Sequence, residues 1–250
     1  MGKQKQKLSV VEGSSIDVHK AYSGKKFTQH DLESFPNPTY PQTQYIDSHY
    51  RDTPIILQIG SAGTGKTAVA MYCSLSDVFD KSTPYDKIAI FRSAVQARDI
   101  GFLPGDQTEK NEAYEAPYSA LCDEFLKFKT NNYENLKSVG LIEFHNTSFL
   151  RGTTFNDTIL IVDECQNMTY EELSTIMTRV GVRSKIIFCG DFGKQIDLHK
   201  RNDVCGVERF MKVIERMDSS STDVVRYTPN DIVRSGIVKE FLIAEEECER

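Results

Sequence analysis

Signatures of zinc sites and disulfide frameworks are absent from this sequence. No two of the six cysteines form a C-x-x-C pair, and no histidine stands at the spacing of a zinc ligand. Cysteines so far apart are not the pattern of a small secreted domain held by disulfides. We therefore expect reduced thiols in a cytoplasmic protein at Cys73, Cys122, Cys165, Cys189, Cys205 and Cys248.

Long apolar segments are missing as well. Residues 1–11 alternate lysine and glutamine and contain no apolar stretch of the kind that a signal peptide has. No other stretch approaches the roughly 18 apolar residues that span a membrane. We expect a soluble protein that is neither secreted nor anchored.

The sequence also lacks an excess of positive charge. Its formal net charge is −6 and its pI is about 5.5, whereas a protein that binds nucleic acid over much of its surface is usually basic. Any nucleic acid would therefore have to be held by a local patch.

Length and composition predict one domain with polar ends. A chain of 250 residues, 39% of them hydrophobic, suffices for one sizeable core. Residues 1–40 are polar and predict an arm, whose lysines are either solvated or in contact with a phosphate backbone. We expect the domain itself over 41–245 and an acidic, solvated tail over 246–250.

The stretch Gly60-Ser61-Ala62-Gly63-Thr64-Gly65-Lys66-Thr67 lies between a predicted strand, Ile55–Ile59, and a helix predicted to run to about Phe79. A strand, a glycine-rich loop and a helix in this order make a phosphate-binding P-loop. Backbone N–H groups turn toward the phosphates, Lys66 reaches the β- and γ-phosphates, and Thr67 offers its hydroxyl group to Mg²⁺. A glycine-rich hairpin would have no use for the Lys-Thr pair. The predicted ligand is a nucleoside triphosphate.

A second chemical element follows the aliphatic run Ile159–Val162, which ends in Asp163 and Glu164. One carboxylate can hold Mg²⁺ and the other can polarise an attacking water molecule. The pair means little alone, but downstream of a P-loop it predicts nucleotide hydrolysis.

Further aliphatic runs and helical periodicities alternate along the chain, which indicates an α/β fold. Strands are expected at Lys87–Phe91, Leu141–Phe144, Lys185–Cys189 and Val224–Tyr227. Helices are expected from Pro117, from Thr169 through Val180, over Val207–Met217 and from Asp231 to about Ile243.

Polar side chains beside these strands are candidate ligand contacts. Gln195 follows the strand Lys185–Cys189, and open α/β sheets bind ligands at the carboxyl ends of their strands, so we expect it to sense the γ-phosphate. Gln42 and Tyr45 precede the P-loop strand, where they would either read and stack on adenine or be ordinary residues of a surface loop.

The ordered motifs resemble those of the PhoH-like ATPases over about Gln42 to Leu242. The resemblance rests on Gly60–Thr67, Gly101–Gly105, Arg151–Thr154, Val162–Asn167, Thr178–Gly181, Gln195–Leu198 and Asp231–Arg234. It implies a RecA-like P-loop fold similar to the first motor domain of superfamily-1 helicases, with a mostly parallel sheet flanked by helices on both faces. It also implies ATP and Mg²⁺ as cofactors and favours adenine contacts by Gln42 and Tyr45.

Two positions depart from the family pattern. Ser93 follows Arg92 where the family usually has proline, and three residues separate Asp191 from Gln195 where two are usual.

The resemblance implies a catalytic set of Lys66, Glu164 as base and Gln195, with Thr67 and Asp163 at the metal. The expected function couples ATP hydrolysis to binding or remodelling of RNA or single-stranded DNA. One lobe leaves the nucleotide open, so we expect a homo-oligomeric ring, for example a hexamer, in which a neighbour supplies an arginine. The candidates are Arg151, Arg179 and Arg234.

Two other functions remain open at this point. The chain could be an ATP-switched binding module that regulates a partner, which nucleic acid should not stimulate. It could also be a small-molecule P-loop kinase, but no arginine-rich lid is evident, and Glu164 with Gln195 favours water as the acceptor.

Overall fold

The computed structural model describes residues 27–93, 107–128, 131–147, 152–191 and 206–248. Within these ranges six strands form one fully parallel sheet in the order β3-β2-β4-β5-β1-β6. The strands are β1 (Ile55–Gly60), β2 (Lys87–Arg92), β3 (Ile142–Asn146), β4 (Thr158–Asp163), β5 (Lys185–Gly190) and β6 (Thr222–Tyr227). The four inner strands arise from predicted aliphatic runs, because a strand covered on both faces needs apolar residues throughout. The edge strands β3 and β6 are only partly buried and carry polar residues as well.

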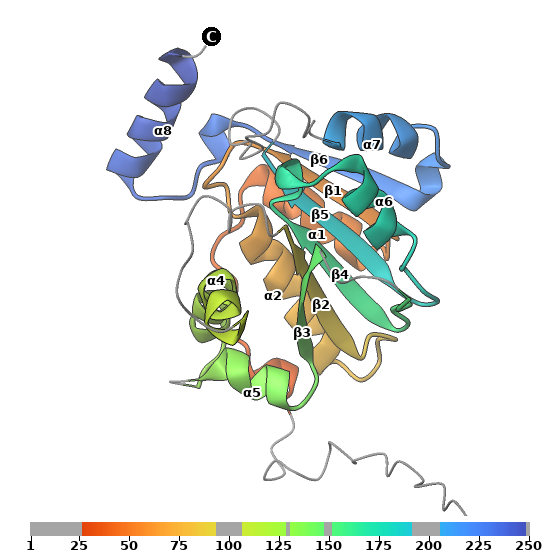
Figure 1. Cartoon of the computed structure of the whole chain (residues 1–250). Coiled ribbons are helices and arrows are strands. Elements are labelled where there is room, and N and C mark those ends of the chain that lie inside the picture. Colours follow the sequence, from red (N-terminus) through yellow and green to blue (C-terminus); the bar gives the residue numbers. More distant parts are fainter. Residues whose placement is uncertain (1–26, 94–106, 129–130, 148–151, 192–205, 249–250) are drawn as a thin grey trace, which may run out of the picture.

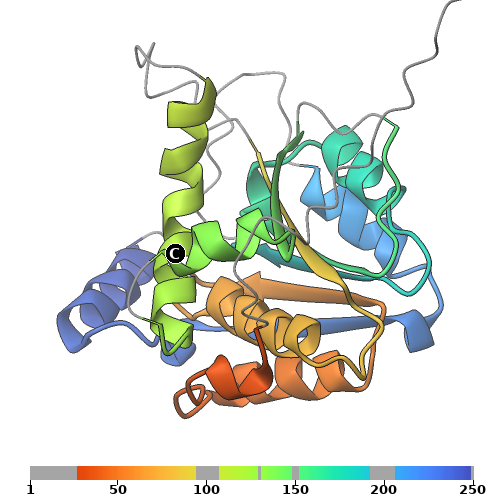
Figure 2. The same ribbon diagram turned by 90° about the horizontal axis from the view of Figure 1, so that it is seen from below.

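Helices cover both faces of this sheet (Figures 1 and 2). Successive strand residues point to opposite faces, so Ile88 and Ile90 belong to the core under α1, α2, α4 and α5, while Ala89 and Phe91 belong to the core under α6 and α7. The helices are α1 (Tyr40–Tyr50), α2 (Lys66–Phe79), α4 (Gln107–Phe125), α5 (Asn132–Ser138), α6 (Tyr170–Met177), α7 (Val207–Ile214) and α8 (Gly236–Cys248). The predicted α/β class and RecA-like arrangement are confirmed.

The sheet order brings the two chemical motifs to one edge. β5 lies between β1, which leads into the P-loop, and β4, which ends in Asp163. All three strands run in the same direction, so their carboxyl ends meet there. This edge is where an open parallel sheet binds its ligand.

The prediction of a polar arm is wrong for residues 27–39. Leu32 is buried, the Phe27 ring stacks on Phe79, and Phe35 packs against Tyr72 and Phe125. These few apolar side chains lie among polar residues, so the sequence shows only weak periodicity there. In the structure each of them packs on the core beside α2 and α4. Residues 1–26 lie outside the described part of the chain.

Two predicted helix starts are also wrong. Pro117 lies inside α4, which begins at Gln107. The start was missed because the residues before Pro117 are mostly polar and show no apolar periodicity. Asp231 ends a short 3₁₀ turn, Pro229–Asp231, and α8 starts only at Gly236. Arg234 is therefore in the connection before α8. In contrast, the predicted capping box at Thr169 and Glu172 is confirmed at the start of α6.

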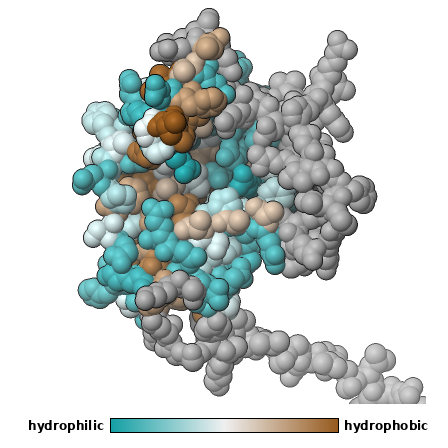
Figure 3. Space-filling view, turned by 90° about the vertical axis from the view of Figure 1, so that its left-hand side faces the viewer, coloured by the Kyte–Doolittle hydropathy of each residue, from teal (hydrophilic) through white to brown (hydrophobic). Residues whose placement is uncertain are grey.

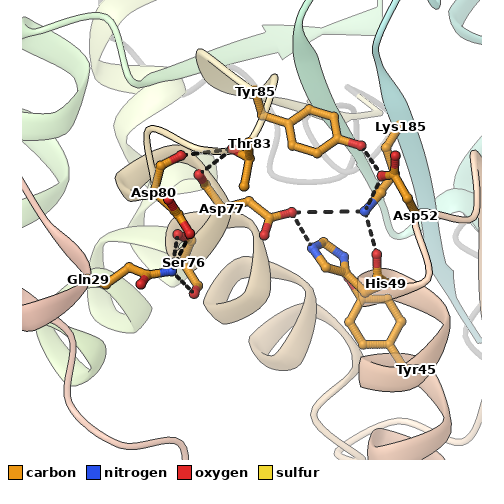
Figure 4. Close-up of polar contacts among 10 residues, drawn as sticks. All are labelled: Gln29, Tyr45, His49, Asp52, Ser76, Asp77, Asp80, Thr83, Tyr85 and Lys185. Atoms are coloured by element: carbon orange, nitrogen blue, oxygen red, sulfur yellow. Dashed lines mark hydrogen bonds and ion pairs between the residues drawn. The ribbon is translucent and has the colours of Figure 1, made fainter.

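A buried polar network fixes α1 to α2 and β5 at the amino ends of the strands (Figure 4). His49 Nε2 lies 2.8 Å from Asp77 Oδ2, and the Tyr45 hydroxyl lies 3.0 Å from His49 Nδ1. The Lys185 side chain, 1% exposed, donates to the His49 carbonyl oxygen at 2.6 Å and pairs with Asp52 at 3.2 Å. The charge of Lys185 is thus matched inside the protein rather than by water.

Helix α8 extends beyond the edge of the sheet and exposes apolar side chains. In Figure 3 hydrophobic residues gather at the upper end of the visible face, over α8, where Ile237 is 79% and Phe241 64% exposed. The described residues therefore leave part of the apolar surface of α8 uncovered. Within the described residues no helix combines the length and apolarity needed to cross a membrane.

Candidate nucleotide-binding and catalytic site

The P-loop makes a tight turn between β1 and α2 that requires glycine. Gly60, Gly63 and Gly65 have φ angles of 132°, 72° and 77°, which side chains rarely permit. A Cβ at Gly60 would lie 1.9 Å from the carbonyl oxygen of Tyr227 on β6. Gly65 is the N-cap of α2, so the loop leads directly into a helix N-terminus, the usual place for a bound phosphate.

Lys66 is buried and folds over this loop. Its Nζ donates to the carbonyl oxygens of Gly60 at 2.7 Å and Ser61 at 2.8 Å. Burial lowers the pKa of Lys66, while Asp191, followed by Cys189 and the carboxylates of Glu164 and Asp163, opposes that shift. When the loop N–H groups hold a phosphate, the phosphate oxygens would replace these carbonyl oxygens as hydrogen-bond acceptors for the Lys66 ammonium group.

The two predicted metal ligands are brought together from distant parts of the chain. Thr67 Oγ1 donates to Asp163 Oδ1 at 2.6 Å, and Asp163 is only 5% exposed. Mg²⁺ prefers such hard oxygen donors and usually takes one or two protein ligands beside phosphate and water oxygens. The described residues contain no group of three or more His, Cys, Asp or Glu side chains placed for a metal. The oxygen atoms of Thr67 and Asp163, 2.6 Å apart, fit Mg²⁺ that is shared with a nucleotide.

Glu164 stands at a sharp bend directly after β4. Its φ of 51° lies in the left-handed region, and its Oε2 accepts a hydrogen bond of 2.6 Å from Gln166 Nε2. Burial raises the pKa of Glu164, and the neighbouring Asp163 carboxylate raises it further. A carboxylate with a raised pKa is a stronger general base.

Sequence reasoning missed the residues that surround these carboxylates. Gln166 is fully buried and also accepts a hydrogen bond from the Asp191 N–H group at 3.1 Å, so it joins Glu164 to the end of β5. Tyr118, which recurs with Leu121, Cys122 and Phe125 at helical spacing after Pro117, donates to Asp163 Oδ2 at 2.8 Å. Its hydroxyl group was the available signal, because a buried hydroxyl needs a hydrogen-bond partner.

The structure contradicts the expected stacking role of Tyr45. Tyr45 is fully buried on α1, and its hydroxyl lies against His49, so its ring has no face open to a base. Gln42 is 4% exposed, accepts from the Thr39 N–H group and donates to the Thr64 carbonyl oxygen at 2.9 Å. Gln42 contacts the P-loop itself, and its contact with adenine stays a prediction.

The two candidate arginines that the structure describes, Arg179 and Arg234, lie in different parts of the fold. Arg234 is beside its own P-loop: its Cγ is 3.2 Å from where a Cβ at Gly63 would lie, and the neighbouring Val233 N–H group donates to the Gly63 carbonyl oxygen at 3.0 Å. Arg179 follows α6, where its carbonyl oxygen accepts from the N–H group of Phe155, before the start of β4. Arg151 and Gln195 lie outside the described residues, as does Gly101–Gly105.

With this geometry described, comparison with known proteins identifies the family. The PhoH-like protein family matches residues 36–245. This chain belongs to the PhoH-like family. The match covers the described elements from α1 to α7 and α8 as far as residue 245, including the P-loop and Asp163.

Relatives with PhoH names come from several bacteria. A PhoH-like protein of Mycobacterium leprae is 35% identical over 213 residues, which are 84% of this chain and 58% of that protein. Protein PhoH of Escherichia coli is 31% identical over 192 residues, or 76% of this chain and 52% of the relative. This PhoH-like chain thus spans a little over half the length of these two relatives.

Solved structures resemble it more distantly. The large terminase of a thermophilic bacteriophage, in complex with ADP, aligns with 82% of this chain and 49% of its own, at 17% identity and a TM-score of 0.46. The Pif1 helicase of Candida albicans aligns with 78% of this chain and 41% of its own, at 16% identity and a TM-score of 0.36.

Proposed function

We propose that this PhoH-like protein is a Mg²⁺-dependent ATPase. The observation that carries the proposal is the 2.6 Å contact between Thr67 of the P-loop and Asp163 at the end of β4, with Lys66 and Glu164 at the same edge. A phosphate-binding loop alone would suit any nucleotide-binding protein. The added carboxylate pair supports hydrolysis, because it supplies a metal ligand and a base for water.

Each residue has a separate task in this proposal. Lys66 and the loop N–H groups bind the β- and γ-phosphates, and Thr67 with Asp163 holds the metal. Bound Mg²⁺ supplies neutralisation of the phosphate oxygens. Glu164, oriented by Gln166, takes the proton of the attacking water molecule. Gln195 is proposed to sense the γ-phosphate from the segment after β5.

We further propose that hydrolysis is coupled to RNA or single-stranded DNA. The support is the resemblance of the ordered motifs to the PhoH-like ATPases, whose fold is similar to the first motor domain of superfamily-1 helicases. Because the net charge of the chain is −6, the nucleic acid would have to be held by a local patch. A cytoplasmic location fits these substrates.

The deciding experiment measures ATP hydrolysis by the purified chain with and without single-stranded RNA or DNA. A nucleic-acid-coupled ATPase should turn over faster with the polymer, whereas equal rates would identify an ATP-switched module instead. Absence of any hydrolysis with Mg²⁺, with and without the polymer, would contradict the proposal as a whole.

We propose a homo-oligomeric ring as the active assembly, and a hexamer as one candidate. A single lobe leaves one side of the nucleotide open, and an arginine that reaches the γ-phosphate is worth about 10³ to 10⁵ in rate. A neighbouring subunit could supply it.

A further inference from the structure

Tyr118 is a buried side chain aimed at the proposed metal ligand from a helix that carries no recognised motif. It lies in the middle of α4 and is fully buried. Its hydroxyl donates to Asp163 Oδ2 at 2.8 Å, while Thr67 donates to Asp163 Oδ1 at 2.6 Å. The two oxygens of one carboxylate are therefore held by two different elements.

The tyrosine hydroxyl is itself part of a chain of hydrogen bonds. The hydroxyl is the donor in its contact with Asp163, because an ionised carboxylate can only accept a hydrogen bond. Arg92, the last residue of β2 and the neighbour of Asp163 across the strands, hydrogen-bonds the same hydroxyl group. Linked hydrogen bonds to a charged group strengthen one another in a buried setting.

The position of Tyr118 is fixed by the packing of α4 rather than by the site. Lys137 of α5 pairs with Glu115 of α4 at 2.6 Å, and the ring of Tyr118 packs near Phe144 of β3, with 6.0 Å between centroids. Removing the hydroxyl oxygen would leave that packing in place. What would change is the freedom of the Asp163 carboxylate to rotate away from Thr67.

We propose that Tyr118 is a positioning residue that occupies Asp163 Oδ2 and so directs Oδ1 toward the Mg²⁺ site shared with Thr67. This inference rests on the proposed function, because it concerns the metal of the same site. It assigns α4 a role in metal affinity. In this proposal Tyr118 acts through Asp163 and not by its own contact with the nucleotide or the metal.

The test compares wild-type protein with Tyr118→Phe in titrations of a fluorescent, non-hydrolysable ATP analogue at increasing Mg²⁺. We expect Tyr118→Phe to raise the Mg²⁺ concentration for half-maximal binding by about 10- to 100-fold, the usual cost of losing an outer-shell partner of a metal ligand. Affinity for the analogue in excess chelator should be unchanged, since Lys66 and the loop are intact.

Tyr85→Phe is the matched control. Tyr85 also donates to an aspartate, Asp52, but at the opposite end of the sheet, so its removal should leave the Mg²⁺ requirement unchanged. An unchanged requirement in a folded Tyr118→Phe protein would overturn the inference. Should circular dichroism show that Tyr118→Phe does not fold, Arg92→Gln decides: a raised Mg²⁺ requirement supports the inference, and an unchanged one overturns it.

The wild-type titration separates the two possible failures. If wild-type binding depends on Mg²⁺ but Tyr118→Phe behaves like wild type, only the role of Tyr118 is lost. If wild-type binding is indifferent to Mg²⁺, the metal assignment fails and the positioning role fails with it.

Discussion

At the scale of single residues, Lys66 and Glu164 are expected to act on different steps. Lys66 neutralises phosphate charge in the bound state, whereas Glu164 matters only when water attacks. Lys66→Ala should therefore weaken nucleotide binding and abolish turnover. Glu164→Gln should bind ATP normally and lose about 10²- to 10⁴-fold in hydrolysis, the usual contribution of a general base. Equilibrium binding and steady-state hydrolysis measure the two effects separately.

Glu171→Gln provides the control for the base assignment. Glu171 is an exposed carboxylate in the first turn of α6, outside the site. Its loss should change neither the affinity for ATP nor the rate of hydrolysis. Near-normal turnover by Glu164→Gln would show that another group activates the water molecule.

At the scale of secondary-structure elements, a substitution of Gln42 tests whether α1 contacts the adenine base or stabilises the P-loop. Its amide donates to the Thr64 carbonyl oxygen at 2.9 Å. Loss of a buried partner leaves that carbonyl unsatisfied and costs about 1 to 3 kcal/mol. We expect Gln42→Ala to weaken the binding of ATP and GTP by the same factor, as measured by competition titration.

Gln44→Ala, on the exposed side of the same helix, is the matched control and should bind both nucleotides as wild type does. A selective loss of ATP affinity in Gln42→Ala would favour the adenine contact after all, and the bracing role would be rejected.

The network beneath α1 predicts a pH dependence of stability. Burial lowers the pKa of His49 and the Lys185 ammonium group lowers it further, although the hydrogen bond to Asp77 acts in the opposite direction. The unfolded chain therefore binds the proton more readily than the folded chain. The stability due to neutral His49 is present above the unfolded pKa of about 6.5 and is lost as pH falls through the folded value, at no more than about 1.4 kcal/mol per pH unit.

Urea unfolding at several pH values measures this effect. The difference in unfolding free energy between wild type and His49→Gln should shrink as pH falls from about 6.5 toward 5, because only the wild type must protonate a buried imidazole. His30→Gln alters an exposed histidine. Its unfolding free energy should differ from that of wild type by the same amount at every pH. A constant difference for His49→Gln would argue against a buried neutral imidazole.

At the scale of the whole molecule, the geometry separates the candidate arginines by the subunit each could serve. Arg234 lies beside its own P-loop, so we expect it to act within its own chain. Arg179 lies beyond the amino end of β4, whereas Asp163 is at the carboxyl end. Six strand residues span roughly 17 Å, so Arg179 is too far from the P-loop of its own chain, and we expect any finger role of Arg179 to be played across subunits.

Mixing inactive proteins tests this division. Lys66→Ala mixed with Arg179→Ala should regain part of the ATPase activity if Arg179 acts across subunits, because some interfaces then hold both groups intact. Lys66→Ala mixed with Arg234→Ala should regain none. Arg183→Ala, which removes an exposed arginine paired with Asp157, should stay active by itself. If neither Arg179→Ala nor Arg151→Ala is rescued in assemblies shown to be mixed, the ring loses its mechanistic reason.

The sequence by itself determined the chemistry that is local. The glycines, Lys66 and Thr67 lie within eight consecutive positions, and Asp163 and Glu164 are adjacent, so residue type and spacing sufficed to predict their roles. The strands followed from their aliphatic runs, and α6 from the capping box at Thr169, because those signals also act over a few residues.

Only the tertiary structure decided which distant side chains complete the site. Tyr118 and Asp163 are 45 positions apart, and Gln42 and Thr64 are 22 apart. Whether such pairs meet depends on how a helix is rotated and seated on the sheet, which apolar periodicity fixes only approximately. From the sequence, such a tyrosine is interpreted as a core residue and such a glutamine as a surface residue. The role of each depends on the partner that the fold places against it.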